Sequence, residues 1–244
     1  MHLYYLFSEP SNWTNLDEAL LAYVSEERKK KITAYHQAKD KRQSLYAALL
    51  LSYACTDQYD LPFGEIDPLW PRTGKPVLQT HPEIHFSLAH SGLCAAVAVS
   101  DEEVGLDAEL IGKAPLETMR KAFTPAEALQ VCQSADPNLE FYRIWTRKEA
   151  YGKYLGTGLS STVFKTDTLL QEHDCRITEG ILKRNTPLER SACFADLPVW
   201  NPGSSEDSSA VADHLYFSVY GKTEPAELIP VSFEALMEYV LLCV

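Results

Sequence analysis

The sequence predicts an α+β (mixed α/β) fold, because strand-like runs of apolar or alternating residues are separated by segments with helical spacing. The strand-like runs are Met1–Phe7, Ile84–Leu88, Leu93–Val99, Val104–Leu110, His214–Tyr220 and Glu238–Val244. With 244 residues, 45% of them hydrophobic, the chain can bury one large core or two small ones.

Capping motifs indicate where the helices begin. Ser25 before an acidic pair opens one helix, and Asp40-Lys41-Arg42-Gln43 reads as a capping box that opens another. Thr124-Pro125-Ala126-Glu127 is a further capping box with proline at the first helical position, so we expect Glu127 to be structural. The turn-rich stretch Trp200–Ser209 predicts a polar loop that carries no chemistry.

The composition argues against several classes of protein. The net charge is −12, from 22 basic and 34 acidic residues, which disfavours nucleic-acid binding. No apolar run reaches the roughly 18 to 20 residues of a membrane helix, so no membrane association is expected. Met1–Phe7 lacks the basic lead and the cleavage site of a signal peptide, and we expect an opening strand in a cytoplasmic protein.

The six cysteines are scattered along the chain with no close pair. This spacing argues against a zinc site and against a disulfide framework, and it favours buried free thiols.

Positive charge is concentrated near the N-terminus. Between Glu26 and Arg42 seven basic residues stand against three acidic ones, a local charge of +4, which leaves −16 for the remainder. Taken alone, such a run favours a solvated helix face, but basic side chains spaced along helices can also form an anion pocket.

Two acidic motifs about forty residues apart indicate a magnesium site. Asp107 and Glu109 are two apart on a predicted strand, so their carboxylates share one face. Glu149 and Lys153 are four apart on a predicted helix, one turn from each other. Mg²⁺ prefers carboxylates, waters and substrate phosphates as ligands, so three carboxylates beside one lysine suit a diphosphate substrate. Taken alone, an Asp-x-Glu pair on a strand is most often a solvated edge, and a Lys-Glu-x-x-x-Lys helix is usually a surface salt-bridge ladder.

Five ordered segments between residues 72 and 158 resemble the signatures of phosphopantetheinyl transferases, specifically the larger Sfp-type branch. They are Arg72-Thr73-Gly74-Lys75-Pro76, His85–Ser91, Val104–Glu109, Phe123–Glu127 and Trp145–Lys153. One position departs from the family pattern: Ala89 stands before His90, where many members have serine.

The resemblance implies two similar α/β halves related by a pseudo-twofold, with the cofactor bound between them. Residues 1–102 would form the N-terminal half, residues 103–222 the C-terminal half, and residues 223–244 a tail that packs back on the core.

The resemblance also implies an activity of the holo-[acyl-carrier-protein] synthase type, with coenzyme A as co-substrate and Mg²⁺ as cofactor. A serine of an acyl or peptidyl carrier protein would attack the β-phosphate of coenzyme A and release adenosine 3′,5′-bisphosphate. Asp107, Glu109 and Glu149 would hold the metal. Asp107, Glu149 and Lys153 would be catalytic, with Glu149 as candidate general base and Lys153 balancing charge on the leaving phosphate.

The coenzyme A contacts implied by the resemblance come mostly from the first half. Arg28, Lys31 and Arg42 are the candidates for the 3′-phosphate, with Ser44 nearby. Lys75 and His90 would hold the pyrophosphate and the nucleotide, and Lys153 would contact the pyrophosphate from the second half.

Family members are usually monomeric, and they serve carrier proteins of fatty-acid, polyketide, nonribosomal-peptide or lysine-pathway synthases. Because carrier proteins are typically acidic and this chain is acidic too, we expect docking to depend on local surface. The candidates are Arg143, Arg147, Lys148 and exposed apolar residues between Leu116 and Phe123.

Two alternatives remain from the residues themselves. One is a magnesium-dependent phosphatase or nucleotidyl hydrolase that uses water as the nucleophile. The other is a non-catalytic module that binds coenzyme A and tolerates the loss of Glu149.

Overall fold

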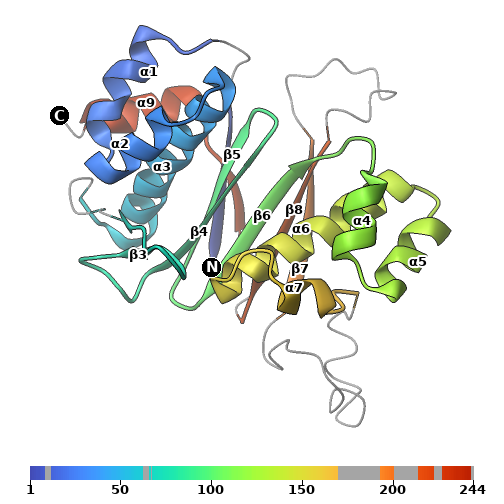
Figure 1. Ribbon diagram of the computed structural model, residues 1–244. Coiled ribbons are helices and arrows are strands. Elements are labelled where there is room, and N and C mark those ends of the chain that lie inside the picture. The colour runs from blue at the N-terminus through green and yellow to red at the C-terminus, as the bar shows by residue number, and fades with distance from the viewer. Residues whose placement is uncertain are drawn as a thin grey trace. The chain divides into compact units, whose positions relative to one another are not determined.

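The computed structural model describes residues 1–8, 12–62, 66, 68–169, 193–200, 214–222 and 227–242. The chain divides into two compact units, Met1–Glu103 with Pro225–Val244, and Val104–Glu224. Both combine helices with an antiparallel or mixed sheet (Figure 1), and the predicted α+β class is confirmed.

Unit 1 is built on a four-stranded sheet of order β4-β5-β1-β9. Its strands are β1 (His2–Phe7), β4 (His85–Ser91), β5 (Cys94–Ser100) and β9 (Glu227–Pro230). The first three pair antiparallel, and β9 pairs parallel with β1. A short ribbon of β2 (Pro68–Leu69) and β3 (Val77–Leu78) completes the strands of this unit in the described residues.

Helices cover one side of the unit 1 sheet (Figure 1). They are α1 (Asn15–Leu20), the 3₁₀ turn η1 (Leu21–Tyr23), α2 (Glu26–Thr33), α3 (Ala38–Tyr59) and α9 (Phe233–Leu242). The long helix α3 lies against β1, β4 and β5, and α9 packs on α3. The core between them is apolar, with Leu49, Val97 and Leu236 fully buried.

Unit 2 is built on the antiparallel sheet β6-β8-β7. Its strands are β6 (Val104–Leu110), β7 (Cys193–Trp200) and β8 (His214–Gly221), and its helices are α4 (Leu116–Ala122), α5 (Pro125–Gln133), α6 (Pro137–Leu155) and α7 (Ser161–Lys165). The long helix α6 crosses β6 and β8, and α5 and α7 pack on α6 (Figure 1). Each unit therefore places one long helix across its sheet.

Four of the predicted strands inside the chain are confirmed within a few residues as β4, β5, β6 and β8, and the opening strand as β1. The prediction of a strand at Glu238–Val244 is wrong, because residues up to Leu242 belong to α9. Leu236 and Val240, four residues apart, form the buried side of that helix. The short apolar run at the end of the chain does not by itself distinguish a strand from a helix.

The structure confirms two of the three predicted helix starts, and the third helix begins at a different residue. The Ser25 side chain caps α2, and Thr124 with Glu127 forms a capping box at α5. Helix α3, however, begins at Ala38, with Gln37 as N-cap, so Asp40 lies inside the first turn. Trp200 ends β7, whereas the rest of the predicted loop, residues 201–209, lies outside the described residues.

Among the cysteines that the structure describes, Cys55 and Cys94 are buried free thiols and Cys132 is exposed. The remaining three predicted buried thiols lie where no side chain is described. Within the described part of the chain, no helix is both long and apolar enough to cross a membrane.

Candidate active site

The approach of α6 to β6 depends on Gly105. A Cβ at this position would lie 2.6 Å from the amide nitrogen of Tyr154 and closer still to the carbonyl oxygen of Ala150. Both are backbone atoms of α6, which cannot swing aside as a flexible side chain does. Glycine thus permits the close packing that brings α6 over the acidic end of β6, a role that its place in the sequence motif did not reveal.

Asp107 and Lys153 meet where the two elements cross. The Lys153 Nζ donates to Asp107 Oδ1 at 2.8 Å. The second carboxylate oxygen, Oδ2, is buried and has no hydrogen-bond partner among the described residues. Burial raises the pKa of Asp107 above its ordinary value, although the positive charge of Lys153 acts in the opposite direction. This side chain therefore keeps an acceptor available after pairing.

Glu109 and Glu149 lie close to the same pair. The Trp145 indole Nε1 on α6 donates to Glu109 Oε1 at 3.1 Å, which holds that carboxylate against the helix. The pKa of Glu149 is raised to about 7, chiefly by burial and next by the negative charge of Asp107, while Lys153 acts in the opposite direction. Glu109 adds a smaller repulsion. The sequence prediction that these carboxylates share one region is consistent with this mutual repulsion.

The donor set suits a hard dication, because carboxylate oxygens are the side-chain ligands that Mg²⁺ prefers. A bound cation would relieve the repulsion among Asp107, Glu109 and Glu149 and would use the orphaned Asp107 Oδ2. As they lie, these side chains do not converge into a ready cluster: in the described part of the chain, no three His, Cys, Asp or Glu side chains are grouped to hold an ion. The chemistry of the residues thus fits the metal, whereas a closed coordination shell is not preformed.

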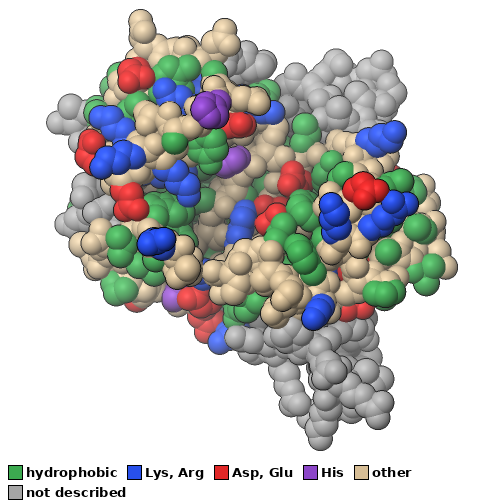
Figure 2. Space-filling model, in the orientation of Figure 1, with side chains coloured by type: hydrophobic (Ala, Val, Ile, Leu, Met, Phe, Trp, Pro, Cys, Tyr) green, Lys and Arg blue, Asp and Glu red, His purple; other side chains and the backbone are tan. Residues whose placement is uncertain are grey.

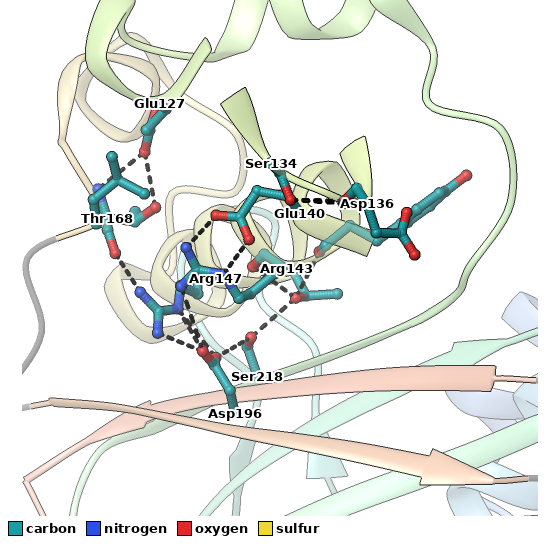
Figure 3. Close-up of polar contacts among 12 residues, drawn as sticks. Glu127, Ser134, Asp136, Glu140, Arg143, Arg147, Thr168, Asp196 and Ser218 are labelled. Carbon is teal, nitrogen blue, oxygen red and sulfur yellow. Dashed lines mark hydrogen bonds and ion pairs between the residues drawn. The ribbon is translucent and has the colours of Figure 1, made fainter. Parts of the chain in front are cut away.

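A second set of charged residues on α6 is internal to unit 2 (Figure 3). Arg147, 3% exposed, donates from Nε to both Asp196 oxygens at 3.1 and 2.9 Å and from NH1 to the Thr168 carbonyl at 2.7 Å. Asp196 also accepts from the Ser218 hydroxyl at 2.8 Å. Arg143 pairs with Glu140 and lies 3.8 Å from Asp196.

Lys148 is also internal. Its Nζ lies 2.8 Å from Glu127 Oε2, with both side chains fully buried, and it donates to the Thr166 carbonyl at 2.8 Å. Glu127 Oε1 in turn accepts from the Thr168 amide and hydroxyl at 2.9 and 2.8 Å. The prediction that Arg147 and Lys148 dock a partner is wrong, because these buried side chains are committed to contacts inside the unit. The same contacts support the structural interpretation of Glu127.

The apolar docking candidates between Leu116 and Phe123 differ in how exposed they are. Leu116 at the start of α4 is 58% exposed, whereas Phe123 is buried and stacks on Phe141. Leu116 remains available at the surface, and Phe123 belongs to the core of unit 2.

In unit 1 the basic candidates separate into two groups, and Figure 2 shows Lys and Arg side chains distributed over its helices. Arg28 is 5% exposed and donates from NH2 to the Ser44 carbonyl at 3.0 Å. The Nζ of Lys31 lies 4.4 Å from the centroid of the Trp70 ring, which Arg28 also contacts. Arg28, Lys31 and Ser44 are therefore neighbours.

Arg42 belongs to a different network. Its Nε donates to Asp17 Oδ1 at 3.1 Å and its NH2 to the Tyr46 hydroxyl at 2.7 Å. Asp17 is fully buried and also accepts from Tyr46 at 2.6 Å. This buried network joins α1 to α3, so Arg42 is occupied in the packing of the unit.

Lys75 and His90 lie on separate parts of unit 1. Lys75 forms an ion pair with Glu103, whose other carboxylate oxygen lies 3.3 Å from His85 Nδ1. Burial lowers the pKa of Lys75, and Glu103 partly restores it. His90 is exposed near the end of β4, while the preceding Ala89 is buried on the opposite face of the strand.

Known proteins resemble both parts of this chain. Residues 103–197 match the model of the 4′-phosphopantetheinyl transferase superfamily, and residues 10–102 match the N-terminal model of 4′-phosphopantetheinyl transferase. The 4′-phosphopantetheinyl transferase Sfp of Bacillus subtilis strain 168 is 23% identical over 97% of this chain and 100% of its own length.

Two further relatives share parts of the sequence. The 4′-phosphopantetheinyl transferase psf-1 of Bacillus pumilus is 31% identical over 59% of this chain and 62% of its own. The human L-aminoadipate-semialdehyde dehydrogenase-phosphopantetheinyl transferase is 26% identical over 56% of this chain and 49% of its own. Together with the two adjoining family matches, these relatives show that the chain is a transferase enzyme of the 4′-phosphopantetheinyl transferase superfamily, similar to Sfp along nearly its whole length.

Proposed function

We propose that this enzyme moves the phosphopantetheine arm of coenzyme A onto a serine of an acyl or peptidyl carrier protein and releases adenosine 3′,5′-bisphosphate. The observation that supports this most directly is the cluster on α6 and β6, where Lys153 pairs with Asp107 beside a Glu149 whose pKa is raised to about 7. A phosphoryl-type transfer needs charge neutralisation and a proton acceptor more than covalent chemistry, and this cluster contains residues suited to both.

Asp107, Glu109 and Glu149 are the residues that would hold Mg²⁺. When bound, the ion would neutralise charge on the pyrophosphate that otherwise repels the incoming hydroxyl. The unpartnered Asp107 Oδ2 and the repulsion that raises the pKa of Glu149 support this assignment.

Glu149 is the proposed general base. A carboxylate whose pKa lies close to neutral is better matched to accept a proton from a serine hydroxyl than an ordinary glutamate. It would take that proton directly or through one water as the oxygen attacks the β-phosphate. Because Glu149 is partly buried on a helix that Gly105 holds against β6, its position is preorganised.

Lys153 is proposed to stabilise the charge that develops on the leaving phosphate. Its ammonium group is held by Asp107, which keeps it close to the carboxylates. A preorganised cation of this kind lowers the barrier because it does not have to be reoriented during the reaction.

Unit 1 is proposed to bind the nucleotide part of coenzyme A. Arg28, Lys31 and Ser44 would contact the 3′-phosphate, and Lys75 and His90 would contact the pyrophosphate and nucleotide. The proximity of Arg28, Lys31 and Ser44 supports the first group. Arg42 is omitted from the proposal because Asp17 and Tyr46 already occupy its guanidinium.

The test is intact-protein mass spectrometry of several apo carrier proteins incubated with the enzyme, coenzyme A and Mg²⁺. We expect each accepted carrier to gain one phosphopantetheine, with the gain abolished by a chelator and restored by added Mg²⁺. Glu149→Gln serves as the catalytic control and should give at most a trace of product.

Other results would support the alternatives. Release of adenosine 3′,5′-bisphosphate without any carrier modification would indicate a hydrolase. Binding of coenzyme A without turnover on any carrier would indicate a binding module. A chelator-insensitive transfer would retain the activity and contradict the magnesium assignment.

A further inference from the structure

Trp70 directly follows β2, and its indole ring makes cation–π contacts with two basic side chains of α2. The guanidinium carbon of Arg28 lies 4.8 Å and the Nζ of Lys31 4.4 Å from the ring centroid. Residues three apart on a helix are neighbours, so these two positive groups repel each other across one turn. The electron-rich face of the indole attracts both and therefore offsets part of that repulsion.

The ring itself is anchored from within unit 1. Trp70 packs edge-to-face on Phe86 of β4, with the ring centroids 6.2 Å apart, and it follows the β2–β3 ribbon. Phe86 is buried in the core of the unit. The indole is consequently a fixed surface on which two long, otherwise flexible cationic side chains are held in one place.

Three polar groups around this cluster have no hydrogen-bond partner among the described residues. They are the Trp70 Nε1, the Arg28 Nε and the Ser44 Oγ, all of which are buried atoms. Arg28 is 5% exposed and Ser44 is fully buried. Buried donors without acceptors are costly and rare, and two of these three groups are donors only. This unused capacity favours a ligand that accepts several hydrogen bonds.

The charge of the cluster defines that molecule further. Burial lowers the pKa of Arg28 to about 10, and burial followed by the charge of Arg28 lowers the pKa of Lys31. Two cations are thus held beside each other in a place partly removed from water, which a negatively charged ligand would stabilise. A phosphate monoester would supply both negative charge and several acceptor oxygens.

We propose that Trp70 is a positioning residue of a phosphate-monoester site: it holds Arg28 and Lys31 together so that both face one phosphate. The identity of the ligand rests on the function proposed above, in which that phosphate is the 3′-phosphate of coenzyme A. Trp70 would then set the preference of the enzyme for coenzyme A over dephospho-coenzyme A, which lacks this group.

The experiment compares the dissociation constants of coenzyme A and dephospho-coenzyme A by isothermal titration calorimetry, in the wild type and in Trp70→Leu. Because Trp70→Leu removes both cation–π contacts, we expect coenzyme A binding to weaken about tenfold. Dephospho-coenzyme A binding should change less than about twofold, because it lacks the 3′-phosphate that Arg28 and Lys31 would hold.

Two further variants serve as controls. Trp70→Phe keeps an aromatic face for the cations and should retain most of the preference. Trp13→Leu removes a different tryptophan, one that carries Lys41 at 3.7 Å elsewhere in unit 1, and should leave both dissociation constants unchanged. Thermal unfolding midpoints of all variants show whether the fold is intact.

The proposal is overturned if Trp70→Leu weakens both ligands equally, or weakens neither, while remaining folded. If Trp70→Leu does not fold, Trp70→Phe provides the test. A folded Trp70→Phe that has lost the preference for coenzyme A would contradict the cation–π role. The wild type could transfer no phosphopantetheine and still prefer coenzyme A, with that preference lost in Trp70→Leu. This result would refute the proposed function but support the phosphate-monoester site.

Discussion

Two lysines on helix α6 each form an ion pair with a carboxylate. The two pairs differ in whether a hydrogen-bonding atom of the carboxylate is left without a partner. Lys148 and Glu127 are fully buried, and every contact described around them is a partner within unit 2. Lys153 and Asp107 are paired at the same 2.8 Å distance, but Lys153 is 31% exposed and Asp107 keeps an unpartnered oxygen. The comparison teaches that remaining hydrogen-bonding capacity, rather than the presence of an ion pair, separates the catalytic candidate from the structural one.

The largest effect is expected from breaking the buried pair. Lys148→Met leaves Glu127 buried without its cation, which should cost about 3 to 5 kcal/mol of unfolding free energy. Urea denaturation measures this loss. The double variant Lys148→Met with Glu127→Gln removes the uncompensated charge and should recover much of the stability; equal instability of the two variants would contradict the ion-pair explanation.

The pair of Lys153 and Asp107 should respond in the opposite way. Lys153→Ala is expected to slow turnover about a hundredfold, equivalent to about 3 kcal/mol of transition-state stabilisation. With Mg²⁺ present its unfolding midpoint should shift far less than that of Lys148→Met. Single-turnover transfer to a carrier protein measures the rate, and Lys165→Ala, an exposed lysine on α7, is the matched control. Unchanged turnover would remove Lys153 from the catalytic group.

The raised pKa of Glu149 predicts that the free energy of unfolding depends on pH. Its folded-state pKa of about 7 exceeds the roughly 4.3 of an unfolded chain, so the folded protein retains a proton that the unfolded chain loses between these values. Stability should therefore fall as pH rises through this window. In metal-free buffer, Glu149→Gln should exceed the wild type by up to about 3 kcal/mol at pH 8 and by little at pH 4.

Urea denaturation with a chelator, at several pH values, measures that difference. Glu117→Gln, which changes an exposed glutamate on α4, should follow the wild type at every pH. A constant advantage of Glu149→Gln across the pH range would indicate a packing effect rather than ionisation.

The smallest effect is expected at the solvent-exposed pair of Arg120 and Glu117. These side chains are 70% and 73% exposed and lie three apart on α4. Exposed pairs of this kind contribute about 0.2 to 0.5 kcal/mol, so Arg120→Ala should barely move the urea midpoint. A loss comparable to that of Lys148→Met would show that burial does not explain the difference between the pairs.

Several parts of the fold follow from local sequence alone. The alternation of apolar and polar residues predicts β6 and places Asp107 and Glu109 on the side that meets Lys153 and Trp145. The capping box at Thr124 predicts the start of α5, because it depends on groups within one helical turn. The end of the chain could not be assigned in this way, since its apolar residues are compatible with either a strand or a helix.

The sequence by itself determined the family motifs, the acidic and basic residues available for phosphate chemistry, and the helix on which Glu149 and Lys153 lie. The tertiary structure decided which of these charged side chains are buried with partners inside the protein. Arg147 and Lys148 are as basic as Lys153 and lie on the same helix, yet Asp196, Glu127 and Thr168 engage them inside unit 2. A charge becomes structural when folding removes it from water and supplies its partners from distant segments, and neither condition can be derived from neighbours along the chain.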